Sequence, residues 1–264
     1  MTVQNIMGVI TEIAPLRWQE DYDNAGLQVG DLNAEVHKAL IALDVTEELV
    51  DEAVAKSCDL IISHHPLIFR GLKHITPQTY IERVIMKAVK HDIAIISMHT
   101  NLDNSYLGVS RVLAEKLGLK NLLLLQPSVD EPEICGAGMI GEFDQPMKEL
   151  DFLELVAETI GSPCLKHSAL TSRMIKRVAL CGGSGTPFMP DALRCKADAY
   201  LTADIKYHDF FVPEGRILLV DGGHFETEQF TKQLIKELIQ KKIPTFAAEI
   251  AVTNTNAVHY FCKK

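Results

Sequence analysis

Short apolar runs of strand length alternate with amphipathic segments of helix length, and this alternation limits the fold more than any other feature of the sequence. Short apolar runs predict buried strands, and apolar residues spaced three and four apart predict helices that pack on them. Strands that alternate with helices form parallel sheets with helices on their faces. The expected strands are 39–43, 60–62 and 93–96, and the expected helices are 47–56, 81–90 and 109–117.

The second half of the chain repeats the order of the first. The segments 51–65 and 191–204 align in near register, which indicates a weak internal duplication. We therefore predict an α/β fold of two similar domains, each a sheet flanked by helices. The elements expected in this half are strands at 177–181, 199–202 and 217–220 and a helix at 191–196.

A polar segment with two prolines, residues 126–133, suits a linker between the two halves. The domains are therefore expected at 1–126 and 127–243. Residues 244–264 contain one or two further apolar runs, at 245–252 and 258–261, and are expected to return to the sheet of the first domain.

The composition excludes several classes of protein. With 264 residues, 47% of them hydrophobic, the chain can bury a full core without disulfides. A formal charge of -9 repels polyanions, so binding to nucleic acid is not expected. The six cysteines are scattered without a C-x-x-C pair, which indicates a reduced, cytoplasmic protein. No segment has the ~20 apolar residues of a membrane span, and the N-terminus lacks a secretory signal, so no membrane association is expected.

Histidines and carboxylates follow three of the expected strands. His64 and His65 come directly after the second, Asp103 follows the third, and His224 and Glu228 follow the last. Ligands collect beyond the carboxyl ends of parallel strands. Three imidazoles and two carboxylates suit borderline first-row divalent ions better than calcium or magnesium. Five ligands exceed what one catalytic zinc uses, so we predict a two-metal site at the carboxyl edges of the strands, between the domains.

The local sequence is compatible with this site. Neighbouring residues of a strand point to opposite faces, so His64 and His65 act together only if the strand ends before them, and Pro66 supports such an end. The spacing of His224 and Glu228 puts both on one face of a helical turn, which the two glycines before His224 permit.

The motifs around these residues resemble those of a known family. The chain is similar over nearly its whole length to the GTP cyclohydrolase 1 type 2 homologues, also called NIF-three-like proteins, which are dinuclear-metal proteins. Larger relatives carry an additional domain between the two halves, and this chain resembles the short form without it. The segments that carry the resemblance are 23–30, 63–69, 99–103, 202–208 and 223–228.

The resemblance implies a toroidal homohexamer with two divalent ions per chain. It assigns the metal ligands to His64, His65, Asp103, His224 and Glu228. Zinc, manganese, iron, cobalt and nickel all accept such ligands, so the sequence does not name the metal. Glu228 and Asp103 are also the expected catalytic acids and bases.

These features together predict a dinuclear metal-dependent hydrolase that acts on a small molecule. In the GTP cyclohydrolase version, a metal-bound hydroxide attacks the ring of a purine nucleotide, the imidazole ring opens and formate leaves. Two metals would serve a phosphoesterase equally well. A third interpretation is a non-catalytic regulatory or assembly protein in which the ions brace the ring of subunits.

Further polar residues are candidates for contact with substrate. The CGGSG segment, residues 181–185, is either a loop whose backbone amides bind an anion or a plain tight turn. Cys181 or Ser184 as a covalent nucleophile would need a histidine base held by an acid. The residues expected to bind substrate or to orient ligands are Asp23, Asn24, Ser184, Asp204, Lys206 and His208.

Overall fold

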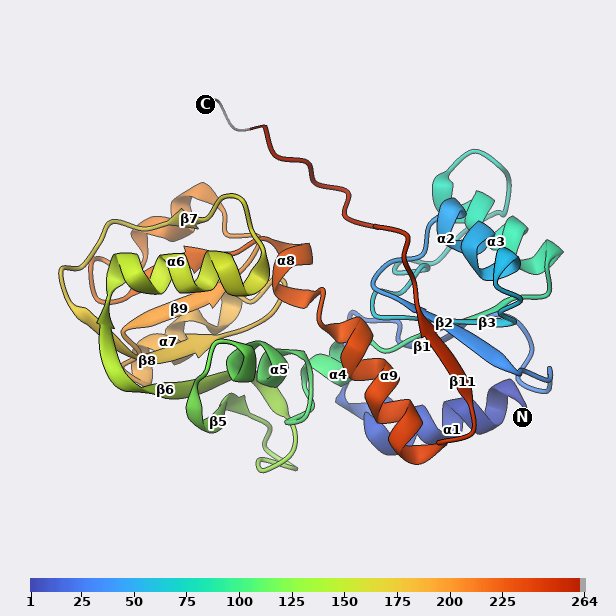
Figure 1. Cartoon of the computed structure of the whole chain (residues 1–264), viewed down its shortest axis with the longest axis horizontal. Helices are drawn as coiled ribbons and strands as arrows, with labels where there is room; N and C mark the ends of the chain where they lie inside the picture. The colour runs from blue at the N-terminus through green and yellow to red at the C-terminus, as the bar shows by residue number, and fades with distance from the viewer. Residues whose placement is uncertain (262–264) are drawn as a thin grey trace. The chain divides into compact units, whose positions relative to one another are not determined.

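The computed structural model describes residues 1–261 and divides the chain into two compact units, each built around one sheet (Figure 1). The first unit comprises residues 1–102 and 231–257, and the second comprises residues 103–230 and, of the described C-terminal residues, 258–261. The α/β fold with two sheets flanked by helices is therefore confirmed. No helix within the described residues combines the length and the apolar character that a membrane crossing requires.

The first unit has a five-stranded sheet. Its strands are β1 (Gly26–Val29), β2 (Lys38–Ala42), β3 (Leu60–Ser63), β4 (Ala94–Ser97) and β11 (Ala247–Ile250). Its helices are α1 (Val3–Ile13), η1 (Leu16–Trp18), α2 (Glu47–Ala55), α3 (Tyr80–Lys90) and α9 (Thr231–Lys242), and α4 (Thr100–Asp103) ends at the unit boundary. The strand order is β1-β4-β3-β2-β11, and only β1 runs antiparallel to its neighbour.

Helices pack on this sheet because its strands are apolar on both faces. Leu40, Ile61 and Ile95 belong to one core cluster with the apolar residues of α2 and α3. Helix α9 contacts β2, β11 and α1, and Figure 1 shows α1 and α9 on the other side of the sheet from α2 and α3. The predicted start of α2 is confirmed, since the Thr46 hydroxyl accepts a hydrogen bond from the Leu49 amide at 3.2 Å.

The second unit has a six-stranded sheet in the order β5-β6-β8-β9-β10-β7, in which β8, β9 and β10 are parallel. The strands are β5 (Lys120–Pro127), β6 (Gly136–Lys148), β7 (Lys166–His167), β8 (Met174–Leu180), β9 (Ala199–Thr202) and β10 (Leu218–Asp221). The helices are α5 (Val109–Lys116), α6 (Glu149–Ile160), η2 (Thr186–Phe188), α7 (Met189–Arg194), η3 (Tyr207–Phe211) and α8 (His224–Glu228).

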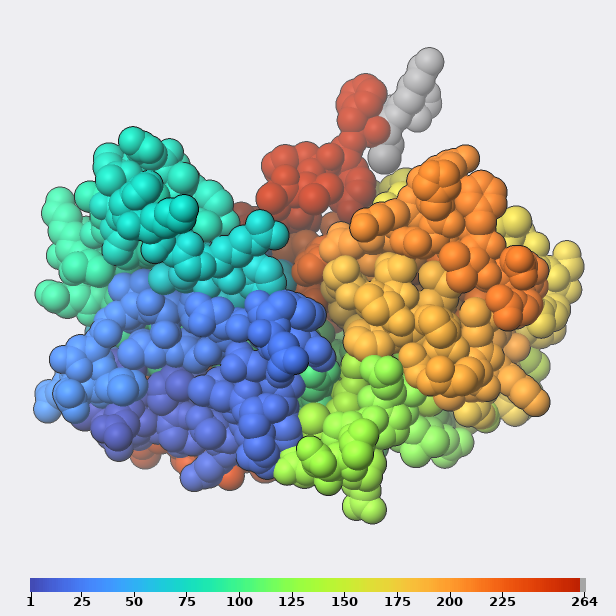
Figure 2. All heavy atoms as spheres, turned by 180° about the vertical axis from the view of Figure 1, so that it is seen from behind, coloured from blue at the N-terminus to red at the C-terminus, as the bar shows by residue number. Residues whose placement is uncertain are grey.

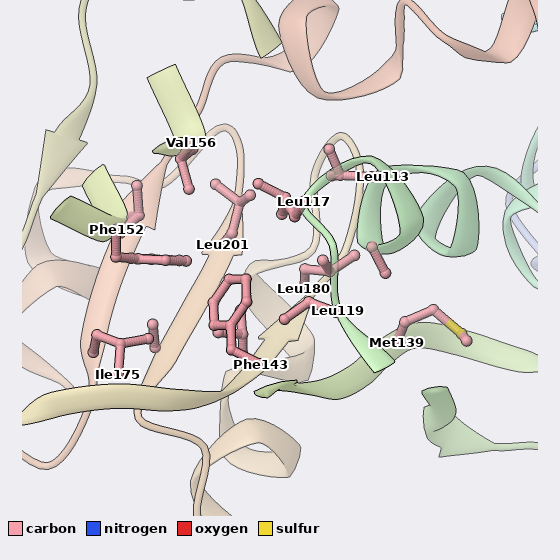
Figure 3. Close-up of a cluster of buried hydrophobic side chains, with 14 of the residues drawn as sticks. Leu113, Leu117, Leu119, Met139, Phe143, Phe152, Val156, Ile175, Leu180 and Leu201 are labelled. Carbon is pink, nitrogen blue, oxygen red and sulfur yellow. The ribbon is translucent and has the colours of Figure 1, made fainter. Parts of the chain in front are cut away.

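Successive side chains of the central strands point to opposite faces of the sheet and pack in different core clusters. Leu180 and Leu201 pack with α5 and α6 in the cluster of Figure 3. Ala179 and Tyr200, one position earlier, pack with α7 in a second cluster. The sheet is therefore covered by helices on both faces, and this packing fixes the positions of the strand ends.

The two sheets share one arrangement of four strands. The order β1-β4-β3-β2 in the first unit corresponds to β7-β10-β9-β8 in the second. In each, three parallel strands are flanked by one antiparallel edge strand, β1 or β7. This correspondence supports the internal duplication inferred from the sequence.

The unit boundaries differ from the predicted ones. The chain changes unit at 102/103 rather than at 126/127, because β5 pairs antiparallel with β6 and belongs to the second sheet. The segment expected as a linker forms the end of β5 and the connection to β6. The chain returns at 230/231 rather than at 243/244, because α9 packs on the first sheet.

The C-terminal part of the chain joins the first sheet once. Strand β11 pairs in parallel with β2, as expected of the returning segment. No strand forms at 258–261, and residues 262–264 of that expected return lie outside the described residues. Residues 252, 253 and 255 are held by side chains of the first unit.

The main anchor of this segment is Glu52 of α2. Its carboxylate accepts hydrogen bonds from the Val252 amide at 2.9 Å and the Thr253 amide at 2.8 Å, and pairs with Lys56 at 2.7 Å. Burial raises the pKa of Glu52, but the hydrogen bonds from Lys56 and Thr253 outweigh it and lower the pKa to about 2. The ionised carboxylate therefore stabilises the fold.

We predict that Glu52→Gln lowers the free energy of unfolding by about 1–3 kcal/mol at pH 7, because Lys56, Val252 and Thr253 lose a charged acceptor. The pKa of Glu52 is depressed in the folded protein, so its stabilising effect is present above the ordinary pKa of 4.5 and is lost as the pH falls toward about 2. Urea unfolding at several pH values measures the difference. The exposed Glu35→Gln is the control, and an equal loss in both variants would contradict this role.

Candidate metal centre

Three histidine side chains form a cluster at the carboxyl ends of the parallel strands of the first unit. His64 and His65 follow β3, and His99 follows β4. The ring centroids lie 4.9 Å apart for His64 and His65, 5.4 Å for His64 and His99, and 5.5 Å for His65 and His99. The strand does end at Ser63, as the pair of histidines and Pro66 predicted, so three imidazoles occupy one small region.

Each of these imidazoles is held through its Nδ1 atom by an oxygen acceptor at 2.7 Å. His64 Nδ1 contacts the Met98 carbonyl, His65 Nδ1 contacts Asp44, and His99 Nδ1 contacts Asp23. A carbonyl or an ionised carboxylate accepts but does not donate, so Nδ1 carries the proton. In the neutral ring the lone pair then lies on Nε2, the atom that binds a metal in this arrangement.

The two carboxylates in these pairs are ionised at neutral pH. For Asp23, burial raises the pKa, but the hydrogen bonds from His99 and Thr100 outweigh it and bring the pKa to about 2. For Asp44, burial is likewise outweighed by the hydrogen bond from His65, and the pKa is lowered. Asp44 also accepts from the Thr255 hydroxyl at 2.9 Å, so the segment after β11 fixes its rotamer.

The second unit holds a matching pair of carboxylates around one imidazole. His224 Nδ1 contacts Asp204 at 2.7 Å, and His224 Nε2 contacts Glu228 at 3.1 Å. Burial lowers the pKa of His224, but the hydrogen bonds with Asp204 and Glu228 raise it more strongly, to about 11. Two carboxylates therefore favour a positive charge at this position, which the imidazolium supplies in the protein alone.

The local sequence brings His224 and Glu228 together. Strand β10 ends at Asp221, and Gly223 has a φ of +89°, which starts the short helix α8 at His224. The predicted helical turn is therefore confirmed, and it places His224 and Glu228 on one face. Asp204 follows β9 with a φ of +55°, a strained value for a residue other than glycine.

The carboxylates of Asp103 and Glu228 lie close to Cys181, which follows β8. Burial, then the charges of Asp103 and Glu228, raise the pKa of the Cys181 thiol far above its usual range. Cys181 is therefore a neutral thiol at physiological pH and lacks the thiolate that a nucleophile needs.

The glycine loop after Cys181 supports the Glu228 side chain. Three of its backbone amides are engaged, since Gly182 donates to Ser110, Gly183 to Thr227 and Gly185 to Thr202, at distances between 2.8 and 3.3 Å. These contacts favour the tight-turn interpretation over an anion cradle. A Cβ atom on Gly183 would overlap the Oε1 atom of Glu228, so a larger residue there would have to displace this carboxylate.

The remaining candidate substrate residues have different positions. Asn24 donates to the Ile68 carbonyl at 2.6 Å, and Ser184 lies exposed in the glycine loop. Lys206 and His208 lie exposed at η3, where the His208 ring contacts Tyr207. The orange residues around η3 lie on the surface of the second unit in the space-filling view of Figure 2.

Two residues of the first unit, Asp44 and His99, were not among the candidates. Both lie directly beyond a parallel strand, Asp44 after β2 and His99 after β4. Strand β3 lies between β2 and β4 in the sheet, so their ends are adjacent to that of β3. The signal that identifies them is therefore their position at strand ends, which the histidine pair shares.

The donors fit a divalent cation of the borderline type. Imidazole nitrogens with a fixed tautomer and nearby carboxylates are the usual ligands of zinc, manganese, iron, cobalt and nickel. The hydrogen bonds to Nδ1 orient the rings and raise their basicity. Among the ligand candidates, His64 and Glu228 are buried and His65 is half-buried.

Comparison with known proteins gives consistent results. The sequence profile described as Duf34/NIF3 (NGG1p interacting factor 3) matches residues 1–258. A Clostridium perfringens protein named GTP cyclohydrolase 1 type 2 homolog is 34% identical over 92% of this chain and 93% of its own. A Campylobacter jejuni protein of the same name is 31% identical over 99% of this chain and its whole length.

Solved structures are similar over the whole chain as well. A hypothetical protein of Staphylococcus aureus has a TM-score of 0.92 at 29% identity and covers 99% of both chains. The protein described as reduced HcgD from Methanocaldococcus jannaschii has a TM-score of 0.78 at 28% identity, with 96% of this chain and 98% of its own covered.

We predict that Gly183→Ala weakens metal binding about tenfold or more, because the new Cβ displaces the Glu228 carboxylate from its position. Gly161→Ala is the matched control, since Gly161 has a similar φ, +64° against +61°, but no atom lies within 4 Å of the Cβ that alanine would add there. Both variants carry the same backbone strain, and only the first moves the Glu228 carboxylate. Titration with zinc or manganese measures the affinity, and equal values for the two variants would exclude this role of Gly183.

Proposed function

Because this chain belongs to the Duf34/NIF3 family, we propose that it is a divalent-metal-dependent hydrolase that opens the ring of a purine nucleotide or a similar heterocycle. The observation that carries the proposal is the fixed Nδ1 atom of four imidazoles. His64, His65, His99 and His224 each contact a carbonyl or carboxylate oxygen at 2.7 Å through this atom. Such orientation is expected of histidines that bind metal.

The proposed ligands are His64, His65, Asp103, His224 and Glu228, and the proposed centre holds two ions. The assignment of all five to one centre comes from the sequence and from the family. Five donors exceed the needs of a single catalytic ion and suit a pair of ions that share a carboxylate. Asp44 and Asp204 then orient imidazole ligands, and Asp23 orients His99 beside them.

When bound, two divalent ions lower the pKa of a coordinated water and polarise the ring of the substrate. The side chains supply the rest of the chemistry. The Glu228 carboxylate accepts a hydrogen bond from His224 Nε2 at 3.1 Å. It is therefore placed to accept or return a proton. Asp103, on the same unit, is the second carboxylate with this capacity. The relatives named GTP cyclohydrolase 1 type 2 homolog make GTP the first substrate to test.

Two further properties belong to the same proposal. The homohexamer is the assembly that the family resemblance implies, and each ring of subunits would carry one centre per chain. A reduced, cytoplasmic location is supported by free cysteines at 58, 135, 164, 181 and 195.

We predict close to two ions per chain after metal loading, and weaker binding, by about ten- to a hundredfold, in Asp44→Asn. The change keeps an acceptor for His65 but removes the charge that raises the basicity of the ring. Asp59→Asn is the matched control. Asp59 makes the same kind of contact, with His37 Nδ1 at 2.8 Å, but at the amino ends of the parallel strands instead of their carboxyl ends. Elemental analysis and zinc titration measure both quantities. A metal content near zero in the loaded wild type would remove the basis of the proposal.

We predict metal-dependent loss of formate from GTP with the triphosphate intact, and no reaction in the His64→Ala/His65→Ala double variant. Mass analysis of the products distinguishes the alternatives, since release of phosphate would identify a phosphoesterase. Unchanged GTP with both proteins would argue against the cyclohydrolase. Loss of the assembly together with the metal would then favour the non-catalytic regulatory role.

A further inference from the structure

Two aromatic side chains of the first unit remain largely exposed beside the histidine cluster. Tyr22 is 66% exposed and Phe69 is 42% exposed. Their ring centroids lie 6.2 Å apart with an interplanar angle of 63°. Folding normally buries such rings, because they carry much of the apolar surface of a chain. A pair of exposed rings in mutual contact therefore points to a use outside the core.

The rings are held in place by polar contacts with the backbone. Gln28 accepts from the Ile68 amide at 3.1 Å, and Asn24 donates to the Ile68 carbonyl at 2.6 Å, which fixes the residue directly before Phe69. Gln28 also donates to the Asn24 carbonyl at 2.6 Å. Tyr22 directly precedes Asp23, whose carboxylate holds His99 and the Thr100 amide. Two amide side chains and one carboxylate thus hold the residues next to Phe69 and Tyr22 in the chain.

The aromatic pair is continuous with the imidazole cluster. The Phe69 centroid lies 6.1 Å from that of His99, with an interplanar angle of 84°. His99 in turn lies 5.5 Å from His65. These separations are those of rings in contact, so one path of rings leads from Tyr22 to the proposed ligand His65. Phe69 therefore lies beside the imidazole cluster.

We propose that Phe69 and Tyr22 form the subsite that binds the flat heteroaromatic ring of the substrate by stacking. This inference rests on the proposed function and names the residues that would hold the base. Every base offers a π-face, so a stacking subsite selects for a flat ring without reading its edge. Asn24 and Asp23, expected as substrate contacts, are then positioning residues that hold the aromatic pair and His99.

The test uses the fluorescent probe 2-aminopurine riboside triphosphate, whose emission falls when its base stacks, with the zinc-loaded protein. The expected result is quenching by the wild type, and a Kd about tenfold weaker in Phe69→Leu and in Tyr22→Leu. Phe69→Trp should restore the affinity, because the ring is kept. Tyr80→Leu is the matched control, since Tyr80 is 57% exposed at the first residue of α3 and should bind as the wild type does.

Zinc content and circular dichroism are measured on each variant, so that a lost ligand or a misfolded chain is recognised. The proposal is overturned if the wild type does not quench the probe, or if both leucine variants bind with unchanged Kd. It is also overturned if inorganic triphosphate alone competes as well as GTP does. If quenching depends on Phe69 but GTP is not turned over, the stacking subsite is supported and the hydrolase function is rejected. Failure of the subsite and failure of the proposed function therefore give different results.

Discussion

The hydrogen-bond register of the parallel strands is the constraint on which the proposed centre depends. In the first unit, Ala42 pairs with Ser63 and Ser63 pairs with Ser97, so β2, β3 and β4 end level. The residues that follow leave the sheet at the same height, where Asp44, His65 and their neighbours meet. A shift of one residue would turn each strand over and send its buried side chains to the opposite face. Each face packs against its own helices, and this packing opposes such a shift, so the core also positions the candidate ligands.

The sequence predicted the parallel strands and their crossover helices because their signals are local. Apolar runs bounded by polar residues identified β3 and β9, and the Thr46 cap identified the start of α2. The unit boundary was not predictable in this way. Strand β5 has a polar, proline-containing end, and its membership of the second sheet follows from pairing with β6 across a reversal of the chain. Sheet pairing is non-local, and composition carries little information about it.

The candidate residues show the same division between local and non-local information. The order of His64 and His65 before Pro66, and the spacing of His224 and Glu228, are local patterns that the structure reproduces as a strand end and one helical turn. The orienting partners are distant in sequence, since Asp44 is 21 residues from His65 and Asp23 is 76 residues from His99. Of these residues, Asp23 was among the candidates from the sequence but His99 and Asp44 were not, because local patterns do not reveal which distant residues pair across strand ends.

The two copies of the duplicated strands build the same pair of groups with exchanged positions. In the first copy the imidazole, His65, follows the middle strand β3, and its carboxylate, Asp44, follows the neighbouring strand β2. In the second copy the carboxylate, Asp204, follows the middle strand β9, and its imidazole, His224, follows the neighbouring strand β10. An alignment of the halves would therefore match a histidine with an aspartate and suggest that the chemistry was lost. What the duplication retains is the pairing of an imidazole with a carboxylate across adjacent strand ends, because parallel strands bring those ends together whichever strand carries which group.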